Sequence, residues 1–274
     1  MLETVVENAP VFFLVAARCV ALIMVSPLFS SKRVPRFAKF ALAGYMSYFI
    51  FPQVSLTAGP YAAYSSYVSS TGRFTQEYIF ILIGEVLIGL IIGFYVSVIF
   101  SAFSTAGQFF AFQMGFSASQ VYDSLSEVEN PLMGEFFNFI ALLVFLQNHW
   151  FQRLFLGGLV SSFKSLNLFS IIDHTDRLSS FMLSSLTILF KDSLTIALPL
   201  MGTLFLINVC MGMLAKAAPQ MNLLAEGFPI LMLTSFFLLT VLMPAICEFF
   251  EDGFVSGFHH LENLFLQFGG GGIE

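Results

Sequence analysis

The residues most able to do chemistry in this sequence are ionisable side chains that lie within or beside long apolar stretches. They are Arg18, Glu85, Lys191, Asp192 and Glu226. An ionisable group at the centre of a membrane helix costs about 2.5–3.5 kcal/mol on insertion scales, so each requires a reason. One interpretation is a proton or ion relay. The other, which we favour, is a buried ion pair of Arg18 with a carboxylate such as Glu85, with the other groups near helix ends.

The histidines and cysteines show no pattern typical of catalysis or metal binding. They are His149, His174, His259, His260, Cys19, Cys210 and Cys247. Adjacent histidines on a helix point about 100° apart, and the cysteines lack any C-x-x-C spacing. The sequence also contains no nucleophile elbow, phosphate-binding glycine loop or H-E-x-x-H motif. We therefore expect no enzymatic activity, no metal site and no cofactor.

Composition excludes two further classes of protein. The chain is 57% hydrophobic and only 10% charged, whereas a soluble domain carries about a quarter charged residues. The net charge is −6, and the basic residues form no stripe that could follow a nucleic-acid backbone. The sequence therefore predicts a membrane protein that does not bind nucleic acid.

Several apolar runs are long enough to be membrane helices, which need about 20 residues. We predict helices at 11–29, 37–51, 78–112, 135–147 with 150–163, 181–213 and 223–250. The fourth region reads as a helical hairpin or a kinked pair. No run alternates with the period of two that membrane strands require. The fold class is therefore all-α and polytopic, with polar loops at 30–39, 57–77, 117–130, 165–180 and 216–222.

Two features of the central region suggest packing and gating roles. Gly89 and Gly93 share one helix face, which permits close approach of another helix; a general packing groove is favoured over a dedicated dimer site. From Gly107 to about residue 130, polar residues interrupt the apolar chain. Such a segment is either associated with a pore or a plain surface loop.

Three stretches carry a resemblance to a known family. They are SPLFS at 26–30 with RVP at 33–35, AGQF at 106–109 with QMGFS at 113–117, and KAAPQMN at 216–222 with GFP at 227–229. In these the sequence resembles the FliR family of the flagellar type III export gate, whose injectisome counterpart is SctT. The resemblance covers about residues 12–265.

The resemblance implies a division of the chain and a set of functional residues. Residues 1–180 would be a FliP-like helical part that holds a plug loop at about 107–130, and residues 181–265 a FliQ-like hairpin. Residues 266–274 are expected to be a flexible Gly-rich tail because of the Gly run at 269–272, independently of the resemblance. The plug residues would be Gly107, Gln108, Gln113, Met114, Gly115, Phe116 and Ser117. The hairpin tip and assembly residues would be Lys216, Pro219, Gln220, Asn222, Gly227, Phe228 and Pro229.

The resemblance also implies the function. The chain would be a structural and gating subunit of the flagellar export channel, present as one copy among FliP and FliQ subunits, with FlhB docked beside it. It would act on exported flagellar proteins at the flagellar basal body in the bacterial inner membrane. The alternatives are the equivalent subunit of a virulence injectisome, a small-solute secondary transporter, which should show inverted repeats with broken helices, and an intramembrane enzyme.

Overall fold

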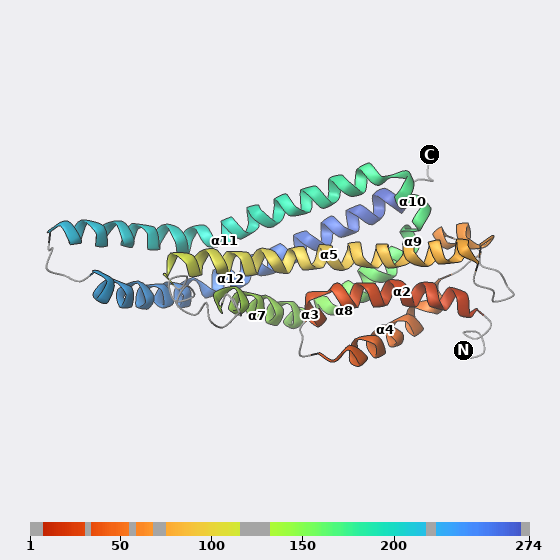
Figure 1. Ribbon diagram of the computed structural model, residues 1–274, viewed down its shortest axis with the longest axis horizontal. Coiled ribbons are helices and arrows are strands. Elements are labelled where there is room, and N and C mark those ends of the chain that lie inside the picture. The colour runs from red at the N-terminus through yellow and green to blue at the C-terminus, as the bar shows by residue number, and fades with distance from the viewer. Residues whose placement is uncertain are drawn as a thin grey trace. The chain divides into compact units, whose positions relative to one another are not determined.

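The computed structural model describes residues 8–30, 34–54, 59–67, 75–115, 132–217 and 223–269, and every regular element in these ranges is helical (Figure 1). The elements are α2 (Ala9–Val25), α3 (Pro27–Ser30), α4 (Arg36–Ile50), η1 (Phe51–Gln53), η2 (Pro60–Tyr64), α5 (Gln76–Gln113), α7 (Leu132–Gln147), α8 (Trp150–Gln152), η3 (Arg153–Leu159), α9 (Val160–Ser165), α10 (Leu168–Asp173), α11 (Thr175–Ala217) and α12 (Leu223–Gly269). The all-α prediction is confirmed.

Within the described ranges, three helices are long and apolar enough to cross a membrane. They are α5, α11 and α12, and the stretch from α7 through α9 would add a fourth span if it is counted as one. α5 has 38 residues, which at 1.5 Å per residue is about 57 Å, almost twice the hydrocarbon thickness. The third predicted helix is therefore confirmed as longer than a simple span.

The first helix is shorter than predicted because a proline follows it. α2 ends at Val25, and the Ser26 N–H still donates to the Leu22 carbonyl at 2.9 Å. Pro27 has no N–H to continue the ladder, so it opens the separate turn α3. The predicted single helix at 11–29 is therefore two elements.

The predicted loop at 165–180 is mostly helical. The Asn167 side chain accepts from the Ser170 N–H at 2.6 Å, and the Ser170 hydroxyl accepts from the Asn167 N–H at 3.1 Å. This capping box starts α10, and α11 begins at Thr175. The polar residues that suggested a loop are thus helix caps and first turns.

The last helix extends well beyond its predicted end at residue 250. Phe250, Phe254, Phe258, Leu261 and Phe265 are buried, at the three- to four-residue spacing of a helix with one apolar face. α12 consequently includes residues 266–269, which were assigned to the flexible tail. Residues 270–274 lie outside the described ranges.

The chain forms two compact units, each assembled from segments distant in sequence. Unit 1 contains Met1–Val98, His149–Ser185 and Ser256–Glu274, and unit 2 contains Ile99–Asn148 and Leu186–Val255. α5, α11 and α12 contribute to both. The predicted division at residue 180 separates parts by their resemblance to FliP and FliQ and not by compactness, and it stays a prediction.

Candidate functional site

Arg18 of α2 and Glu85 of α5 form a buried ion pair in unit 1. The Arg18 Nε lies 2.7 Å from the Glu85 Oε2, and both side chains are 0% exposed. The structure thus brings together the two residues that stood out in the sequence as a pair.

The remaining donors of the Arg18 guanidinium are also satisfied. Nη1 donates to the Ser162 hydroxyl at 3.1 Å, and Nη2 donates to the Leu166 carbonyl at 3.1 Å. The Arg18 Cζ stands 4.2 Å from the centre of the Phe163 ring, within the range of a cation–π contact. Arg18 therefore joins α2 to α9 and to the residue that follows it.

Two tyrosines complete the hydrogen bonding of Glu85. The Tyr61 hydroxyl donates to Oε2 at 2.6 Å and the Tyr64 hydroxyl to Oε1 at 3.0 Å. The Tyr64 oxygen in turn accepts from the Leu168 N–H at 2.6 Å. Burial, together with the Glu85 charge, raises the pKa of both phenols above their ordinary value, so they remain donors at physiological pH.

We name Arg18, Tyr61, Tyr64, Glu85 and Ser162 the buried hub. Its charges are enclosed and its polar groups are paired with one another, which is how a protein stabilises an ion pair away from water. The observed geometry supports a structural junction of α2, η2, α5 and α9 rather than a relay. Removing one partner would leave an uncompensated buried charge.

Sequence reasoning missed the two tyrosines and Ser162. Tyr61 and Tyr64 lie in the predicted loop at 57–77, where they form the short helix η2. Their spacing of three residues after the Gly59-Pro60 pair is a signal that both could face one side of a helical turn. Ser162 gives no such signal, because it is one of many serines in apolar surroundings.

The glycines of α5 face α2 of the same chain. A Cβ built on Gly89 would lie 2.4 Å from the Arg18 carbonyl oxygen and 2.8 Å from the Ala21 Cβ. One built on Gly93 would lie 3.1 Å from the Leu22 carbonyl oxygen. The small-residue face therefore serves packing within the chain, close to the buried hub.

Hydrogen bonds tie both ends of α2 to α5. The Tyr78 hydroxyl donates to the Pro10 carbonyl at 2.8 Å, and the Ser97 hydroxyl donates to the Val25 carbonyl at 2.9 Å. The contacts advance in the same direction along both helices, so α2 lies parallel to α5. This pairing sets the positions of Arg18 and Glu85 along the two helix axes, so that the two side chains lie beside each other.

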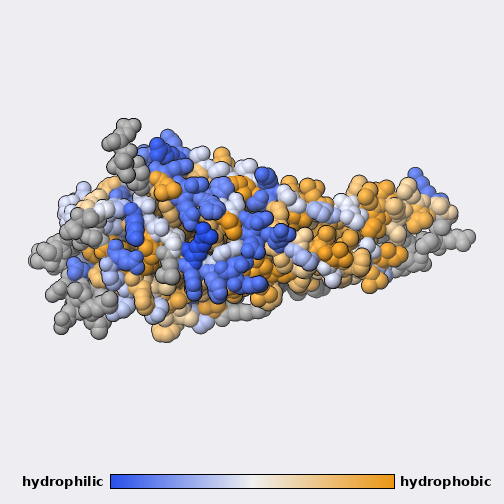
Figure 2. Space-filling model, turned by 180° about the vertical axis from the view of Figure 1, so that it is seen from behind, coloured by the Kyte–Doolittle hydropathy of each residue, from blue (hydrophilic) through white to orange (hydrophobic). Residues whose placement is uncertain are grey.

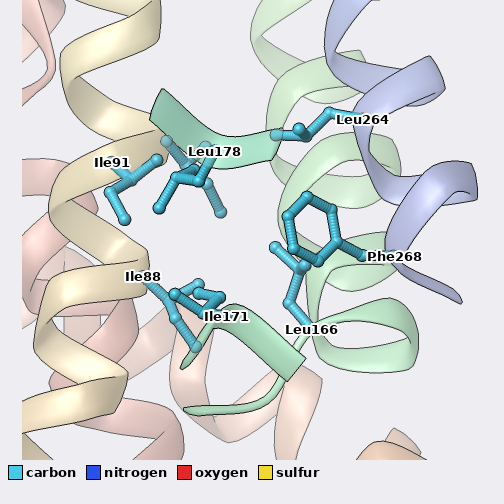
Figure 3. Close-up of a pocket in the computed structure, with 8 residues that line it drawn as sticks. Ile88, Ile91, Leu166, Ile171, Leu178, Leu264 and Phe268 are labelled. Carbon is cyan, nitrogen blue, oxygen red and sulfur yellow. The ribbon is translucent and has the colours of Figure 1, made fainter. Parts of the chain in front are cut away.

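A small apolar cavity lies beside the buried hub. Figure 3 shows side chains from α5, α11 and α12 directed toward it, among them Ile88, Leu178 and Phe268. Leu166, whose carbonyl accepts from Arg18, also lines it. With a volume of about 10 Å³ and apolar walls, it is too small for a substrate or cofactor and is a packing gap.

The predicted plug loop begins later than expected. Gly107, Gln108 and Gln113 belong to α5, and the chain leaves the helix at Met114 and Gly115, where Gly115 has a φ of +83°. This left-handed glycine is a common way to end a helix. Phe116 and Ser117, with the rest of the segment to residue 131, lie outside the described residues.

Gly107 lies inside α5 where α7 packs against it, and its lack of a side chain leaves room for α7. A Cβ there would lie 2.4 Å from the Met133 carbonyl oxygen and 2.4 Å from a ring carbon of Phe137. Gly134 of α7 gives similar room, 3.0 Å from the Ser104 carbonyl oxygen. Gly107, which was assigned to the plug loop, is thus a residue at which α5 and α7 cross.

Phenylalanine side chains of α5, α7 and α12 pack together in unit 2. Phe103 of α5 stacks on Phe250 of α12 with ring centres 4.2 Å apart, and Phe137 of α7 contacts Phe250 at 6.1 Å and Phe110 at 6.3 Å. Phe250 is fully buried. The segment 116–131 therefore starts and ends on helices held together by an aromatic core, which we name the phenylalanine platform.

Part of the predicted hairpin tip is described. Lys216 is exposed in the last turn of α11, and Gly227 is buried in α12, where an added Cβ would lie 3.0 Å from the Met211 Cε. Pro229 is inside α12. Pro219, Gln220 and Asn222 fall outside the described ranges, as does the side chain of Phe228.

Another polar cluster of unit 1 lies on the surface. Arg153 and Glu262 are 3.7 Å apart and 44% and 51% exposed, and His259 lies 3.4 Å from Glu262. Among the residues that the structure describes, no group of three or more His, Cys, Asp or Glu could hold a metal ion. The cluster has the geometry of a solvated ion pair.

Comparison with known families decides the membership of the chain. Residues 9–256 match the family described as "Bacterial export proteins, family 1". The chain belongs to this family. The matched region runs from the start of α2 into α12, so it contains the buried hub, the phenylalanine platform and the α11–α12 hairpin.

Named proteins resemble the chain over two thirds or more of its length. It is 30% identical to the flagellar biosynthetic protein FliR of Escherichia coli (strain K12), over 93% of both chains. It is 25% identical to FliR of Bacillus subtilis (strain 168), over 98% of this chain and 99% of that protein. The surface presentation of antigens protein SpaR of Shigella flexneri is 29% identical over 69% of this chain and 72% of its own length.

Proposed function

We propose that the chain is a structural and gating subunit of the flagellar type III protein export channel, which helps to form and close the conduit for unfolded flagellar subunits. The match to bacterial export proteins over residues 9–256 carries this proposal. The FliR proteins of Escherichia coli and Bacillus subtilis align over 93% and 99% of their length and SpaR of Shigella flexneri over 72%, which favours the flagellar system. The chain would act through its shape, without a catalytic step.

The exposed surface supports a role inside an assembly. Large apolar side chains are exposed along α4, α5, α11 and α12; Phe37, Phe80 and Leu233 are 84%, 69% and 72% exposed. Figure 2 shows apolar side chains over much of the visible surface, with a hydrophilic area among them. Apolar patches of this extent mark contacts with other proteins or with lipid.

We assign those contacts to FliP and FliQ subunits, with one copy of this chain per complex and FlhB docked beside it. The FliP-like part would be residues 1–180 and the FliQ-like hairpin residues 181–265, with Lys216, Pro219, Gln220 and Asn222 at the tip and Gly227, Phe228 and Pro229 following it. The complex would reside at the flagellar basal body in the bacterial inner membrane.

Co-expression tests this proposal directly. The chain would be produced with FliP and FliQ from the same genome, purified through a tag on this chain, and weighed by native mass spectrometry. A large mixed complex with one copy of this chain is the expected result. A monomer or homodimer would contradict the gate proposal, and assembly only with injectisome subunits would move the chain to that system.

The gating role makes a second prediction. The plug would comprise residues 116–131 together with Met114 and Gly115 at the end of α5, on the phenylalanine platform. Deleting residues 117–126 shortens this segment and leaves the platform intact, so the complex should assemble with normal mass. The channel should then conduct small ions, measured as conductance of the purified complex in planar bilayers.

The control for this deletion is Gln113→Ala, which changes a half-buried side chain of α5 and keeps the segment complete. It should leave both assembly and conductance as in the unaltered complex. A deletion complex of normal mass and unchanged conductance would remove the plug assignment from residues 116–131.

A further inference from the structure

The first turn of α4 gathers positive charge that the surrounding sequence does not offset. α4 begins at Arg36, and its first turn holds Arg36 and Lys39 without an acidic residue. The sequence contains no Asp or Glu between Glu7 and Glu77. The positive end of the helix dipole adds to the same potential, because a helix stabilises cations at its other end. This end of α4 therefore favours an anion.

Lys39 lies on the face of α4 that packs against α2 (Figure 1). The residue is only 9% exposed, and it shares this face with Ala43 and Ser47. Side chains of a helix lean toward its N-terminus, so the Lys39 stem runs toward the first turn. Within the described ranges, Lys39 has no hydrogen bond and no ion pair. An ammonium group removed from water is stabilised by an anion or by hydrogen-bond acceptors, so Lys39 requires a partner beyond these residues.

The backbone at this end of α4 is open to the same anion. Pro35 is the N-cap residue, and among the described residues no side chain accepts from the first N–H groups. The Ala38 and Lys39 N–H groups both donate to the Pro35 carbonyl, at 3.0 and 3.4 Å, so the helical ladder begins with them. The N–H groups of Arg36 and Phe37 precede the ladder, and both residues are exposed. Uncapped N–H groups at the start of a helix bind carboxylate and phosphate groups.

Two observations favour a protein carboxylate over a lipid phosphate at the cationic end of α4, by which we mean Arg36, Lys39 and the first N–H groups of this helix. α4 has 15 residues, about 22 Å, whereas the hydrocarbon layer is about 30 Å thick, so the length of α4 does not set its ends at two headgroup levels. The adjacent Phe37 and Phe40 are 84% and 52% exposed, and in the proposed function a neighbouring subunit covers such rings. The anion that reaches Lys39 thus comes from that subunit.

We propose that an Asp or Glu side chain of a neighbouring subunit occupies the cationic end of α4, with its carboxylate paired to the Lys39 ammonium. This inference rests on the proposed function, because it requires the assembled export gate. One carboxylate there neutralises a buried charge and accepts from the first N–H groups of α4. A surface that presents a basic residue at this place would be repelled, so the cationic end selects which surface docks on α4.

Zero-length cross-linking of the assembled complex tests the proposal. A water-soluble carbodiimide joins an ammonium and a carboxylate that are in contact, forming an amide bond with loss of water, and peptide mass spectrometry identifies both residues. The expected product joins Lys39 to an Asp or Glu of another subunit. Lys39→Arg is the matched control. It keeps the positive charge, so the complex should assemble in normal yield, but a guanidinium is not coupled, so this product should disappear.

A second variant measures what the charge contributes to assembly. Lys39→Met keeps a long, unbranched side chain against α2 and removes the charge. Because Lys39 has no polar partner in the described part of the chain, the variant purified alone should unfold at the temperature of the unaltered chain. With co-expressed subunits the yield of mixed complex should fall roughly tenfold or more, since the carboxylate of the neighbour is left unpaired in the interface.

A cross-link from Lys39 to another subunit, together with the assembly defect of Lys39→Met, supports the proposed salt bridge. Three results overturn it: normal assembly of Lys39→Met, a product that joins Lys39 to a carboxylate of this same chain, or an intact complex without any Lys39 product. In the last case, phosphatidylglycerol that native mass spectrometry detects on the complex and that Lys39→Met loses would assign the site to a lipid phosphate. Failure of the unsubstituted subunits to form the mixed complex contradicts the export-gate proposal, and this inference falls with it.

Discussion

Replacement of Arg18 by methionine is expected to reduce the yield of folded protein strongly. Glu85 would remain fully buried with no cation beside it, and breaking a buried pair from one side costs about 3–5 kcal/mol. The total stability of a domain is only about 5–15 kcal/mol. Thermal unfolding of the purified protein, and its yield in complex with co-expressed partners, would measure the loss.

The double variant Arg18→Met with Glu85→Gln separates the buried charge from the lost contacts. It removes both charges and keeps an amide oxygen that can accept from the tyrosines, so it should be more stable than Arg18→Met alone. The matched surface control is Glu262→Gln, because the Arg153–Glu262 pair is about half exposed on each side. That change should stay within about 0.5 kcal/mol of the unaltered protein.

The same variants distinguish a structural hub from a proton relay. A relay predicts that the double variant assembles in normal yield and yet loses export of flagellar subunits. A structural hub predicts that export falls only as far as the amount of assembled complex falls. If Arg18→Met unfolds at the temperature of the unaltered protein, the structural assignment is wrong.

The second large effect is expected at Gly89. In Gly89→Ala the new Cβ would lie 2.4 Å from the Arg18 carbonyl oxygen, a backbone atom that cannot turn aside. α2 and α5 would have to separate, and such overpacking costs about 1–3 kcal/mol. The larger variant Gly89→Leu should prevent assembly. Thermal unfolding of the alanine variant and complex yield of the leucine variant measure these effects.

Gly202→Ala is the control that separates the steric effect of an added methyl group on stability from its effect on helix propensity. Gly202 also lies within a helix, but nothing stands within 4 Å of a Cβ added there. Its substitution should be neutral or should stabilise the protein by up to about 1 kcal/mol, because alanine is the better helix former. Equal effects at positions 89 and 202 would show that helix propensity, and not the contact with α2, controls Gly89.

The ion pair could be predicted from sequence because charge inside an apolar run is rare and demands a partner. Arg18 and Glu85 were recognisable on that ground. Tyr61 and Tyr64 were not, because a polar segment with Gly and Pro gives no direct sign of which side chains turn inward. The partners of a buried charge depend on how distant segments come together, and the local sequence does not contain that information.

The limits of the helices show a similar contrast. Both ends of α5 followed from its apolar run to within two residues, since the helix predicted at 78–112 is Gln76–Gln113 in the structure, whereas the end of α12 did not. The plug loop was predicted to begin at Gly107, but the missing side chain of Gly107 admits α7 and the helix continues to Gln113. The extension of α12 beyond residue 250 was missed because its apolar residues recur every three to four positions instead of forming a run. Reading that period would have extended the helix.

The parallel pairing of α2 with α5 has a consequence for the order of events during synthesis. Arg18 leaves the ribosome 67 residues before Glu85, and its contacts with Ser162 and Leu166 require about twice that length of chain. Until then α2, which has only 17 residues, would carry an unmatched cation. The final packing of α2 must therefore wait for α5 and for residues 162–166, so the buried hub forms only when well over half of the chain has been made.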